Sequence, residues 1–376
     1  MGHFYIISDQ YYPNTAATNH GLGFIKGFSE IGVKADWIFV LPSDNFDVVS
    51  DEYKGVRCRY LWNKKFSKNK ILKHLFKWIP LFRFFLQLKS GDKILFLGGG
   101  EFLWLFLRKK GVKIYHERTE HPDVVKTGHF PWSNFYYKKI IKKVDGLFVI
   151  SQKLRDYFVS IGCPDNKVHV INMIVDSNRF KFIEKQKKTE NYIAYCGNAS
   201  NSKDGVNNLI RAFKNVVAKF PLEKLYIIGQ KPPEESDNTQ LVESLGLRDN
   251  VVFTGLVAAE QIPQLLINAD ILALCRPSSL QNEMGFPTKL GEYLLTGNPV
   301  VVTKVGDIPR FLKDGESALM VETTDVQGFG EKMIWALSHK NEAEEIGLKG
   351  KRVAEDNFDY LKEANKLLNV IQNDEY

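Results

Sequence analysis

The chain has 376 residues, of which 44% are hydrophobic and 25% are charged, and its formal net charge is +7. This length exceeds what one hydrophobic core usually supports, so we expect two domains, and the composition excludes a disordered or fibrous chain. No apolar run approaches the roughly 20 residues of a membrane span, and the first residues lack the pattern of a signal peptide. The four cysteines lack metal-type spacing, which favours free thiols in a reducing compartment. We therefore expect a cytoplasmic protein.

The positive charge is concentrated in the first half of the chain. Residues 1–180 hold 28 Lys and Arg against 16 Asp and Glu, whereas the remainder is net acidic. Residues 63–89 alone contain eight Lys and Arg and no acid, interleaved with aromatic and aliphatic residues at roughly helical spacing. This pattern fits a segment that lies on an anionic membrane surface, and it also fits a solvated helix that packs on a sheet. A second basic and aromatic stretch at 130–143 favours the membrane, and no recognition module supports nucleic-acid binding.

The first half reads as alternating strands and helices. Residues 3–13 predict a buried strand that ends at a Tyr-Pro turn, and residues 14–21 predict a loop that leads into a helix at 22–32. Small residues in that loop, Ala17 and Thr18, would let a ligand approach the backbone. Residues 35–41 and 93–97 predict further strands, but the glycines after residue 97 do not form the pattern of a redox dinucleotide site.

Ionisable residues gather just after the strand predicted from residue 112. They are His116, Glu117, Arg118, Glu120 and His121. Parallel α/β folds place their chemistry just past the carboxyl ends of strands, which favours a functional site here. A charged surface loop is the competing interpretation. Strands at 145–151 and 167–176 complete this half.

The second half repeats the pattern after a lysine-rich linker at 180–191. The predicted strands cover 191–197, 224–230, 250–255, 270–274 and 299–303, and helices lie between them. Short loops between alternating strands and helices imply a parallel sheet covered on both faces. We therefore expect an α/β protein with two Rossmann-like domains whose parallel sheets face each other across a cleft.

Three charged residues of the second half would meet at one edge of its sheet. Lys203 follows the first strand of this half, and Lys289 and Glu292 belong to the helix-like segment at 288–295. Lysines near a helix N-terminus suit a diphosphate, and a carboxylate accepts hydrogen bonds from sugar hydroxyls. No Asp-x-Asp triplet is present, so nothing points to a metal-held diphosphate. This combination is typical of a nucleotide-sugar site.

Three segments of the second half resemble, in order, the C-terminal domain of family 4 retaining glycosyltransferases of the GT-B fold. They are YCGNASNSKDGVNNLIRAF, NVVFTGLVAAEQIPQLLINADI and GFPTKLGEYLLTGNPVVVTKVGDI. The likeness spans nearly the whole chain and is more specific in the second half. It implies an acceptor-binding domain at 1–183, joined by a C-terminal helix at 357–376 that crosses back to it. It also implies a nucleotide-sugar-binding domain at 184–356.

The resemblance implies roles for individual residues of the donor site. Glu292 matches the glutamate that holds the nucleotide ribose, and Lys203 matches the diphosphate lysine. The arginine expected shortly after the strand is replaced by Asn198, and Met284 stands where the family has its first motif glutamate. Lys289 is a plausible substitute cation. The predicted substrate-binding residues are Ala17, Thr18, Asn198, Gly229, Gly255, Glu283, Gly285, Phe286, Pro287, Thr288 and Glu292, and the predicted catalytic residues are His116, Glu117, Glu120, Lys203 and Lys289.

The function implied is transfer of a sugar, with retention, from a UDP- or GDP-linked donor to a lipid-linked or polysaccharide acceptor in cell-surface glycan synthesis. We expect no metal, no cofactor and no nucleic-acid partner, and peripheral contact with an anionic membrane at the inner face of the cytoplasmic membrane. The alternatives are a GT-B-fold epimerase, a phosphorylase, for which no pyridoxal-lysine motif is visible, and a non-catalytic nucleotide-sugar-binding protein.

Overall fold

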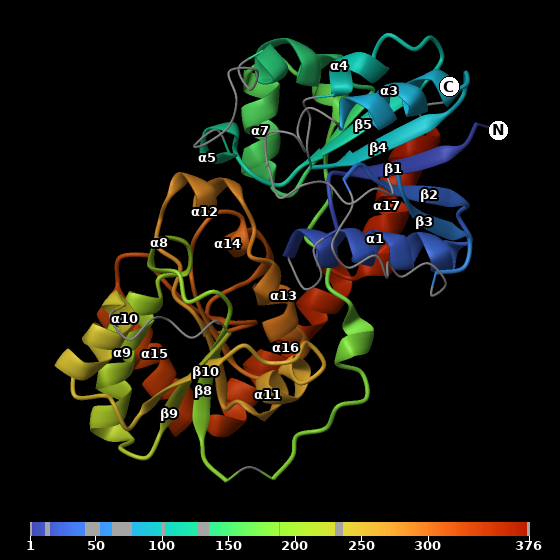
Figure 1. The fold of residues 1–376 in the computed structure, drawn as a ribbon. Helices are drawn as coiled ribbons and strands as arrows, with labels where there is room; N and C mark the ends of the chain where they lie inside the picture. Colours follow the sequence, from blue (N-terminus) through green and yellow to red (C-terminus); the bar gives the residue numbers. More distant parts are fainter. Residues whose placement is uncertain are drawn as a thin grey trace. The chain divides into compact units, whose positions relative to one another are not determined.

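The computed structural model describes residues 2–11, 16–41, 53–61, 77–98, 102–125, 135–187, 189–229 and 236–373. The chain divides into two compact units, which we describe separately (Figure 1). Unit 1 comprises Met1–Ile174 and Tyr360–Tyr376, and unit 2 comprises Val175–Asp359. The chain therefore passes from unit 1 to unit 2 between residues 174 and 175, whereas the sequence placed this domain boundary between residues 183 and 184.

Unit 1 contains a seven-stranded parallel sheet in the order β3-β2-β1-β4-β5-β6-β7. Its strands are short, and the inner ones are mostly buried, because helices cover both faces of a parallel sheet. Phe24, Trp37 and Phe148 lie in its core. The strands are β1 Phe4–Ser8, β2 Ala35–Phe39, β3 Val56–Tyr60, β4 Lys93–Leu97, β5 Lys113–Arg118, β6 Gly146–Val149 and β7 Val168–Val170.

The last helix of the chain packs against the first helix of unit 1. Helix α17 (Tyr360–Asn373) lies along α1 (Ala16–Ile31), as the red and blue ribbons of Figure 1 show. Glycine lets the two backbones approach, since a Cβ at Gly27 would lie 2.5 Å from that of Ala364. The remaining helices are α3 Trp78–Gln87, α4 Leu103–Phe106, α5 Pro122–Val125, the π-helix η1 Tyr136–Ile140, η2 Ile141–Lys143, α7 Gln152–Ser160 and η3 Asp165–Lys167.

Parts of two loops predicted in unit 1 belong to a helix and to a strand. Helix α1 begins at Ala16, so the loop predicted at 14–21 is wrong from that residue onward, and Thr18 and His20 lie on the helix. Strand β5 extends to Arg118, so His116 and Glu117 lie on the strand rather than after it. The polar side chains misled the interpretation, because each finds a hydrogen-bond partner in the folded unit and can therefore be buried.

The basic segment predicted at 63–89 falls partly outside the described residues. Its described part forms the helix α3, and the described part of the stretch at 130–143 forms η1 and η2. Within the residues described, no helix combines the length and the apolar character that a membrane crossing needs.

Unit 2 contains a six-stranded parallel sheet in the order β10-β9-β8-β11-β12-β13. The five strands predicted for this half are confirmed, because each is an apolar run rich in branched side chains that becomes buried between helices. The strands are β8 Tyr192–Cys196, β9 Lys224–Ile228, β10 Val251–Gly255, β11 Ile271–Leu274, β12 Val300–Thr303 and β13 Leu319–Val321.

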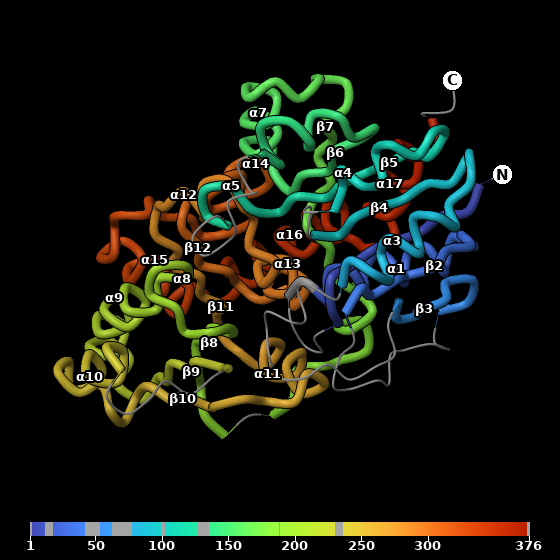
Figure 2. Tube along the Cα trace, turned by 45° about the horizontal axis from the view of Figure 1, so that its top comes forward, coloured from blue at the N-terminus to red at the C-terminus, as the bar shows by residue number. Residues whose placement is uncertain are grey.

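Helices cover both faces of this second sheet. Helix α15 packs against α9 (Figure 2). Gly330 of α15 allows this close contact, because a Cβ there would lie 2.8 Å from the Ala212 carbonyl oxygen. The helices are η4 Ser177–Arg179, α8 Asn201–Asp204, α9 Val206–Lys219, α10 Asp237–Ser244, α11 Ile262–Asn268, α12 Leu280–Met284, α13 Thr288–Leu295, α14 Ile308–Phe311, α15 Val326–Ser338 and α16 Lys340–Asn357. The predicted α/β class with two parallel sheets is confirmed.

The strand order locates the place where each sheet can hold a ligand. In unit 1 the order reverses between β1 and β4, and in unit 2 it reverses between β8 and β11. At such a reversal the connecting helices leave to opposite faces, which opens a crevice at the carboxyl ends of the two strands. A ligand of unit 2 is therefore expected to bind at the loops after β8 and β11.

Candidate functional site

The carboxyl end of β8 brings several backbone segments into close contact. Gly197 follows the strand, and Gly229 follows the neighbouring strand β9 with a φ of +139°. A Cβ on Gly229 would lie 2.2 Å from the Gly197 carbonyl oxygen, so only glycine fits there. Ala199 has a φ of +31°, a conformation that residues with a Cβ adopt rarely. The loop after β8 is thus held in an uncommon shape at the edge where a ligand would bind.

A buried cluster of charges lies beneath this loop. The Lys289 ammonium group donates to Asp204 Oδ2 at 2.5 Å and to the Tyr195 hydroxyl oxygen at 3.1 Å. Tyr195 itself donates to Asp204 Oδ2 at 2.7 Å, and Arg276 Nε donates to Asp204 Oδ1 at 3.3 Å. Asp204 and Arg276 are each about 4% exposed at the side chain, whereas Lys289 is 19% exposed. One carboxylate therefore serves two cations, of which Lys289 is the more accessible.

Burial and charge act in opposite directions on this pair. Burial alone would raise the pKa of Asp204, but Lys289, Tyr195 and Arg276 together hold it below its usual value. Burial lowers the pKa of Lys289, and the Asp204 carboxylate offsets that effect only in part. The carboxylate therefore remains ionised, and the charge of the lysine depends on it.

Glu292 lies one turn after Lys289 on the same helix, α13. Its carboxylate accepts from Arg179 NH1, and Arg179 NH2 donates to the Ala259 carbonyl oxygen at 3.2 Å. The Glu292 side chain is 27% exposed, so it can still accept hydrogen bonds from a ligand. Lys289 and Glu292 thus place a cation and a carboxylate one turn apart near the start of α13.

The other residues predicted for the donor site lie in loops or at the ends of helices and strands of unit 2. Glu283 accepts from Ser278 Oγ at 3.0 Å and from the Gly306 amide at 3.3 Å, while Asn198 is exposed after β8. The Lys203 carbonyl oxygen accepts from Asn282 Nδ2 at 2.8 Å, which fixes its backbone. Gly255 ends β10 with a φ of +73°.

The segment that leads into α13 is shaped mainly by packing. Gly285 ends α12, Pro287 precedes α13, and Thr288 is the first residue of α13. The Phe286 ring is buried against Phe311 and Phe358, with ring centroids 5.5 and 5.3 Å away. The Phe286 ring therefore packs within unit 2 and fixes the loop, and its role toward a substrate stays a prediction.

The candidates in unit 1 form two separate pairs. Glu117 Oε1 accepts from His20 Nε2 at 2.7 Å, and both side chains are buried. His116 is fully buried; its Nδ1 contacts the Tyr136 hydroxyl, and its Nε2 lies 3.3 Å from the Gly98 carbonyl oxygen. The two neighbours pair differently because adjacent residues of a strand face opposite sides of the sheet.

Burial alone would lower the pKa of His20, but the carboxylate of Glu117 outweighs that effect and raises the pKa of His20 above its ordinary value.

The other residues predicted in unit 1 lie on α1 and after β5. Glu120 follows β5 and is half-buried, and Thr18 is buried on α1. Ala17 lies on α1, and its side chain falls outside the described set.

Four contributors to the unit 2 site were not predicted from the sequence. They are Asp204, Arg179, Arg276 and Tyr195, which hold Lys289 and Glu292 in place. Asp204 carried one available signal, since it directly follows Lys203 and precedes a glycine. Its two charged partners lie 72 and 85 residues away in the chain, so no local pattern could reveal the cluster.

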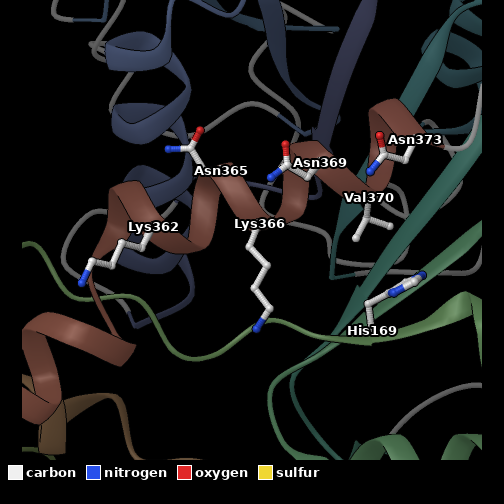
Figure 3. Close-up of a pocket in the computed structure, with 7 residues that line it drawn as sticks. All are labelled: His169, Lys362, Asn365, Lys366, Asn369, Val370 and Asn373. Carbon is white, nitrogen blue, oxygen red and sulfur yellow. The ribbon is translucent and has the colours of Figure 1, made fainter.

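Unit 1 carries a surface hollow whose position does not match that of a substrate site. It measures about 680 Å³ and runs along α17 (Figure 3). His169, one of its lining residues, lies on the edge strand β7, whereas the strand order of this sheet reverses between β1 and β4. Ligands of open parallel sheets bind at such a reversal. Its lining residues are His169, Lys362, Asn365, Lys366, Asn369, Val370 and Asn373.

The part of the chain that the structure describes holds no cluster suited to a metal. Among the described residues, no group of three or more His, Cys, Asp or Glu side chains could hold an ion. The site in unit 2 is instead a cation and a carboxylate beside a helix N-terminus and a glycine-shaped loop. Such an arrangement can bind an anion and a polyhydroxylated group side by side.

Comparison with known proteins connects this arrangement to sugar transfer. Residues 190–339 match the family model described as glycosyl transferases group 1, which covers most of unit 2. A GDP-mannose-dependent alpha-(1-6)-phosphatidylinositol monomannoside mannosyltransferase of Mycolicibacterium smegmatis is 24% identical over 67% of this chain and 69% of its own length. A putative colanic acid biosynthesis glycosyltransferase, WcaL of Salmonella typhimurium, is 26% identical over 52% of this chain. The chain matches only 48% of the length of that second relative.

The fold is shared with solved glycosyltransferase structures. The Anabaena protein Alr3699/HepE, solved in complex with UDP, aligns with a TM-score of 0.75 at 16% identity over 99% of this chain and all of its own. The predicted relationship to group 1 glycosyltransferases and the predicted GT-B architecture are therefore confirmed. These comparisons give no support to the epimerase alternative.

Proposed function

We propose that this chain, whose residues 190–339 match the group 1 glycosyltransferases, moves a sugar from a nucleotide-diphosphate donor to a glycan or lipid-linked acceptor, with retention. The observation that carries this proposal is the pairing of Lys289 and Glu292 on α13 at the switch point of unit 2. A cation next to the end of β8 suits the diphosphate, and a partly exposed carboxylate one turn away suits ribose hydroxyls. The enzyme class is that of its relatives.

The donor is a UDP- or GDP-linked sugar. The Anabaena structure that shares the fold contains UDP, and the mycobacterial relative is named for GDP-mannose, so these two nucleotides are the ones to test. The acceptor is a glycan or a lipid-linked glycan, since the relatives are named for a phosphatidylinositol mannoside and for colanic acid. The product would enter cell-surface glycan synthesis.

In this scheme the protein supplies no nucleophile. Its main contribution is to stabilise the negative charge of the departing diphosphate. Lys289, Lys203 and the backbone N–H groups after β8 would bind the charge that develops as the sugar leaves. The β-phosphate would take the proton of the acceptor hydroxyl on the same face. No metal ion is needed for this scheme, because the cations are side chains of the protein.

The proposal is tested by measuring nucleotide release from UDP- and GDP-linked sugars. We expect release to depend on an added glycan or glycolipid acceptor, because the acceptor hydroxyl is the attacking group. Equal release with and without acceptor would indicate hydrolysis or epimerisation instead. Tight donor binding with no turnover on any acceptor would favour a binding protein.

Contact with an anionic membrane is the second part of the proposal, and helix α3 supports it. Ile79, Phe82 and Leu86 follow one side of this helix at helical spacing and are 43%, 50% and 59% exposed. Trp104 of α4 is also exposed, and so are four cations of α3, α4 and the segments that follow these helices: Arg83, Lys89, Arg108 and Lys110. Apolar side chains bordered by cations fit the interface of an anionic bilayer. The peripheral location at the inner face of the cytoplasmic membrane follows from this contact.

We expect the protein to sediment with phosphatidylglycerol vesicles at low salt and to be released by high salt, because exposed charges are screened. The double variant Phe82→Ser with Leu86→Ser is expected to bind the vesicles about tenfold more weakly, because it removes apolar side-chain area that docking on the bilayer would bury. Leu348→Ser, at an exposed leucine of unit 2, is the matched control. A wild-type protein that stays in the supernatant at low salt would rule out this contact. Lys68, Lys70 and Lys73 of the basic segment at 63–89 lie outside the described residues.

A further inference from the structure

We propose that Asp204 is a positioning residue for the donor diphosphate: it holds the Lys289 ammonium group, as a cation, against the backbone at the end of β8. Asp204 does not itself touch the donor in this account. It acts through Lys289, whose ammonium group would meet the diphosphate. The inference rests on the proposed function, since it assigns a role within the same site.

The position of the ammonium group is fixed from several sides. Lys289 Nζ lies 2.5 Å from Asp204 Oδ2, 3.1 Å from the Tyr195 hydroxyl and 4.7 Å from the centroid of the Tyr195 ring. A Cβ on Gly197 would lie 2.4 Å from Nζ, so the ammonium group sits directly against the backbone of that glycine. Lysine side chains are flexible and lose much rotamer entropy when they are held, so an anchor of this kind reduces the cost of binding an anion.

Asp204 is itself held firmly enough to act as an anchor. Its carboxylate accepts from Tyr195 at 2.7 Å and from Arg276 at 3.3 Å. The residue after it, Gly205, has a φ of +65°, and a Cβ there would lie 1.9 Å from the Cys275 carbonyl oxygen. The end of α8 is thus pressed against the segment that follows β11. Because the carboxylate is buried, its attraction for the lysine is screened less than that of a surface pair.

The charge of Lys289 also depends on Asp204. The groups that face the ammonium are Asp204 of α8, Tyr195 and Cys196 of β8, and Arg276 after β11. Burial lowers the pKa of Lys289 most, and Arg276 lowers it further, while Asp204 is the main group that raises it. Removing the carboxylate charge would lower that pKa again. The lysine would then lose its proton as the pH rises through this lower value, and the site would lose a cation.

The test compares Asp204→Asn with the wild-type protein by titration calorimetry, with UDP and GDP as ligands at pH 7 and pH 9. Asparagine keeps the shape and can still accept from Tyr195, but it carries no charge. We expect about tenfold weaker binding of the diphosphate at pH 7 and a larger loss at pH 9. Comparing variant and wild type at each pH cancels the titration of the nucleotide itself. Affinity for the matching nucleoside, which has no phosphate, should be unchanged.

Two further variants separate this role from a general effect on the fold. Asp314→Asn removes the same charge from a Lys–Asp pair elsewhere in unit 2, where Lys332 Nζ lies 2.9 Å from the carboxylate, and should leave binding unchanged. Asp204→Glu keeps the charge but displaces it, so we expect weaker diphosphate binding with the pH dependence of the wild type. If Asp204→Asn does not fold, an Asp204→Glu protein with wild-type affinity would overturn the inference.

The outcomes distinguish this inference from the proposed function. Wild-type protein that binds neither UDP nor GDP would contradict the proposed function and the role of Asp204 together. Wild-type binding that Asp204→Asn reproduces at both pH values would overturn the role of Asp204 alone. Equal losses for the diphosphate and the nucleoside would also overturn it, because they would reveal a purely structural effect.

Discussion

Replacing Glu292 with alanine is expected to weaken the binding of UDP or GDP about 100-fold. The carboxylate would accept hydrogen bonds from ribose hydroxyls, and hydrogen bonds to a charged group contribute about 1.5–3 kcal/mol each. The side chain is only partly exposed, so part of this attraction acts away from bulk water. Calorimetry on the purified variant measures the loss directly.

A comparison of nucleotides shows whether the loss concerns the ribose. The wild-type protein should bind a nucleotide that lacks a ribose hydroxyl less tightly than the natural one, whereas Glu292→Ala should bind both alike. Glu322→Ala removes a carboxylate from an exposed pair with Lys304 in the same unit and serves as the control. A Glu292→Ala protein that still distinguishes the two nucleotides would show that the ribose is bound elsewhere.

Replacing Lys289 with methionine is expected to lower kcat by about 10²–10³. The ammonium group would stabilise charge on the departing diphosphate, and removal of one such donor typically has this effect. Methionine fills a similar volume but carries no charge. The stabilisation is greatest in the transition state, so kcat should fall more than KM rises.

The stability of this variant must be measured beside its kinetics. Without Lys289 the Asp204 carboxylate keeps Tyr195 and Arg276 as partners but loses its closest cation. We therefore expect a lower free energy of unfolding as well as a lower kcat. Lys304→Met, in the exposed pair with Glu322, is the control for loss of a lysine. A Lys289→Met enzyme with unchanged kcat would exclude this lysine from the chemistry.

Much of unit 2 was predictable because its signals are local. Apolar runs such as Val300–Thr303 become buried strands, and the polar loops between strands and helices fix where the carboxyl ends meet. Lys289 and Glu292 could be placed together for the same reason, since they are three residues apart on one helix. The lysine and the carboxylate therefore lie one turn apart on α13, and their roles toward the donor stay predictions.

The counterions of these two residues could not be predicted, because they come from distant parts of the chain. Arg179 lies 113 residues before Glu292, and Asp204 lies 85 residues before Lys289. Such pairs form only when the fold is complete, and an isolated sequence offers no spacing from which to infer them. The same holds for His20 and Glu117, whose contact spans 97 residues.

The cluster at 116–121 illustrates a different kind of error. The sequence suggested one loop of ionisable groups, but His116 and Glu117 lie on a strand and pair on opposite faces. Each is buried with its own partner, so the two cannot act on one atom in this conformation. The assignment of the unit 1 residue nearest the reacting sugar stays a prediction among His116, Glu117 and Glu120.

The most direct test of the account is the anomeric configuration of the glycoside formed when donor and acceptor are both supplied. Proton NMR of the product in the nucleotide-release assay reads the configuration from the coupling of the anomeric proton. The account predicts that the sugar keeps the configuration it has in the donor, and that the product forms only with acceptor. A product of inverted configuration, or free sugar released without acceptor, would contradict it.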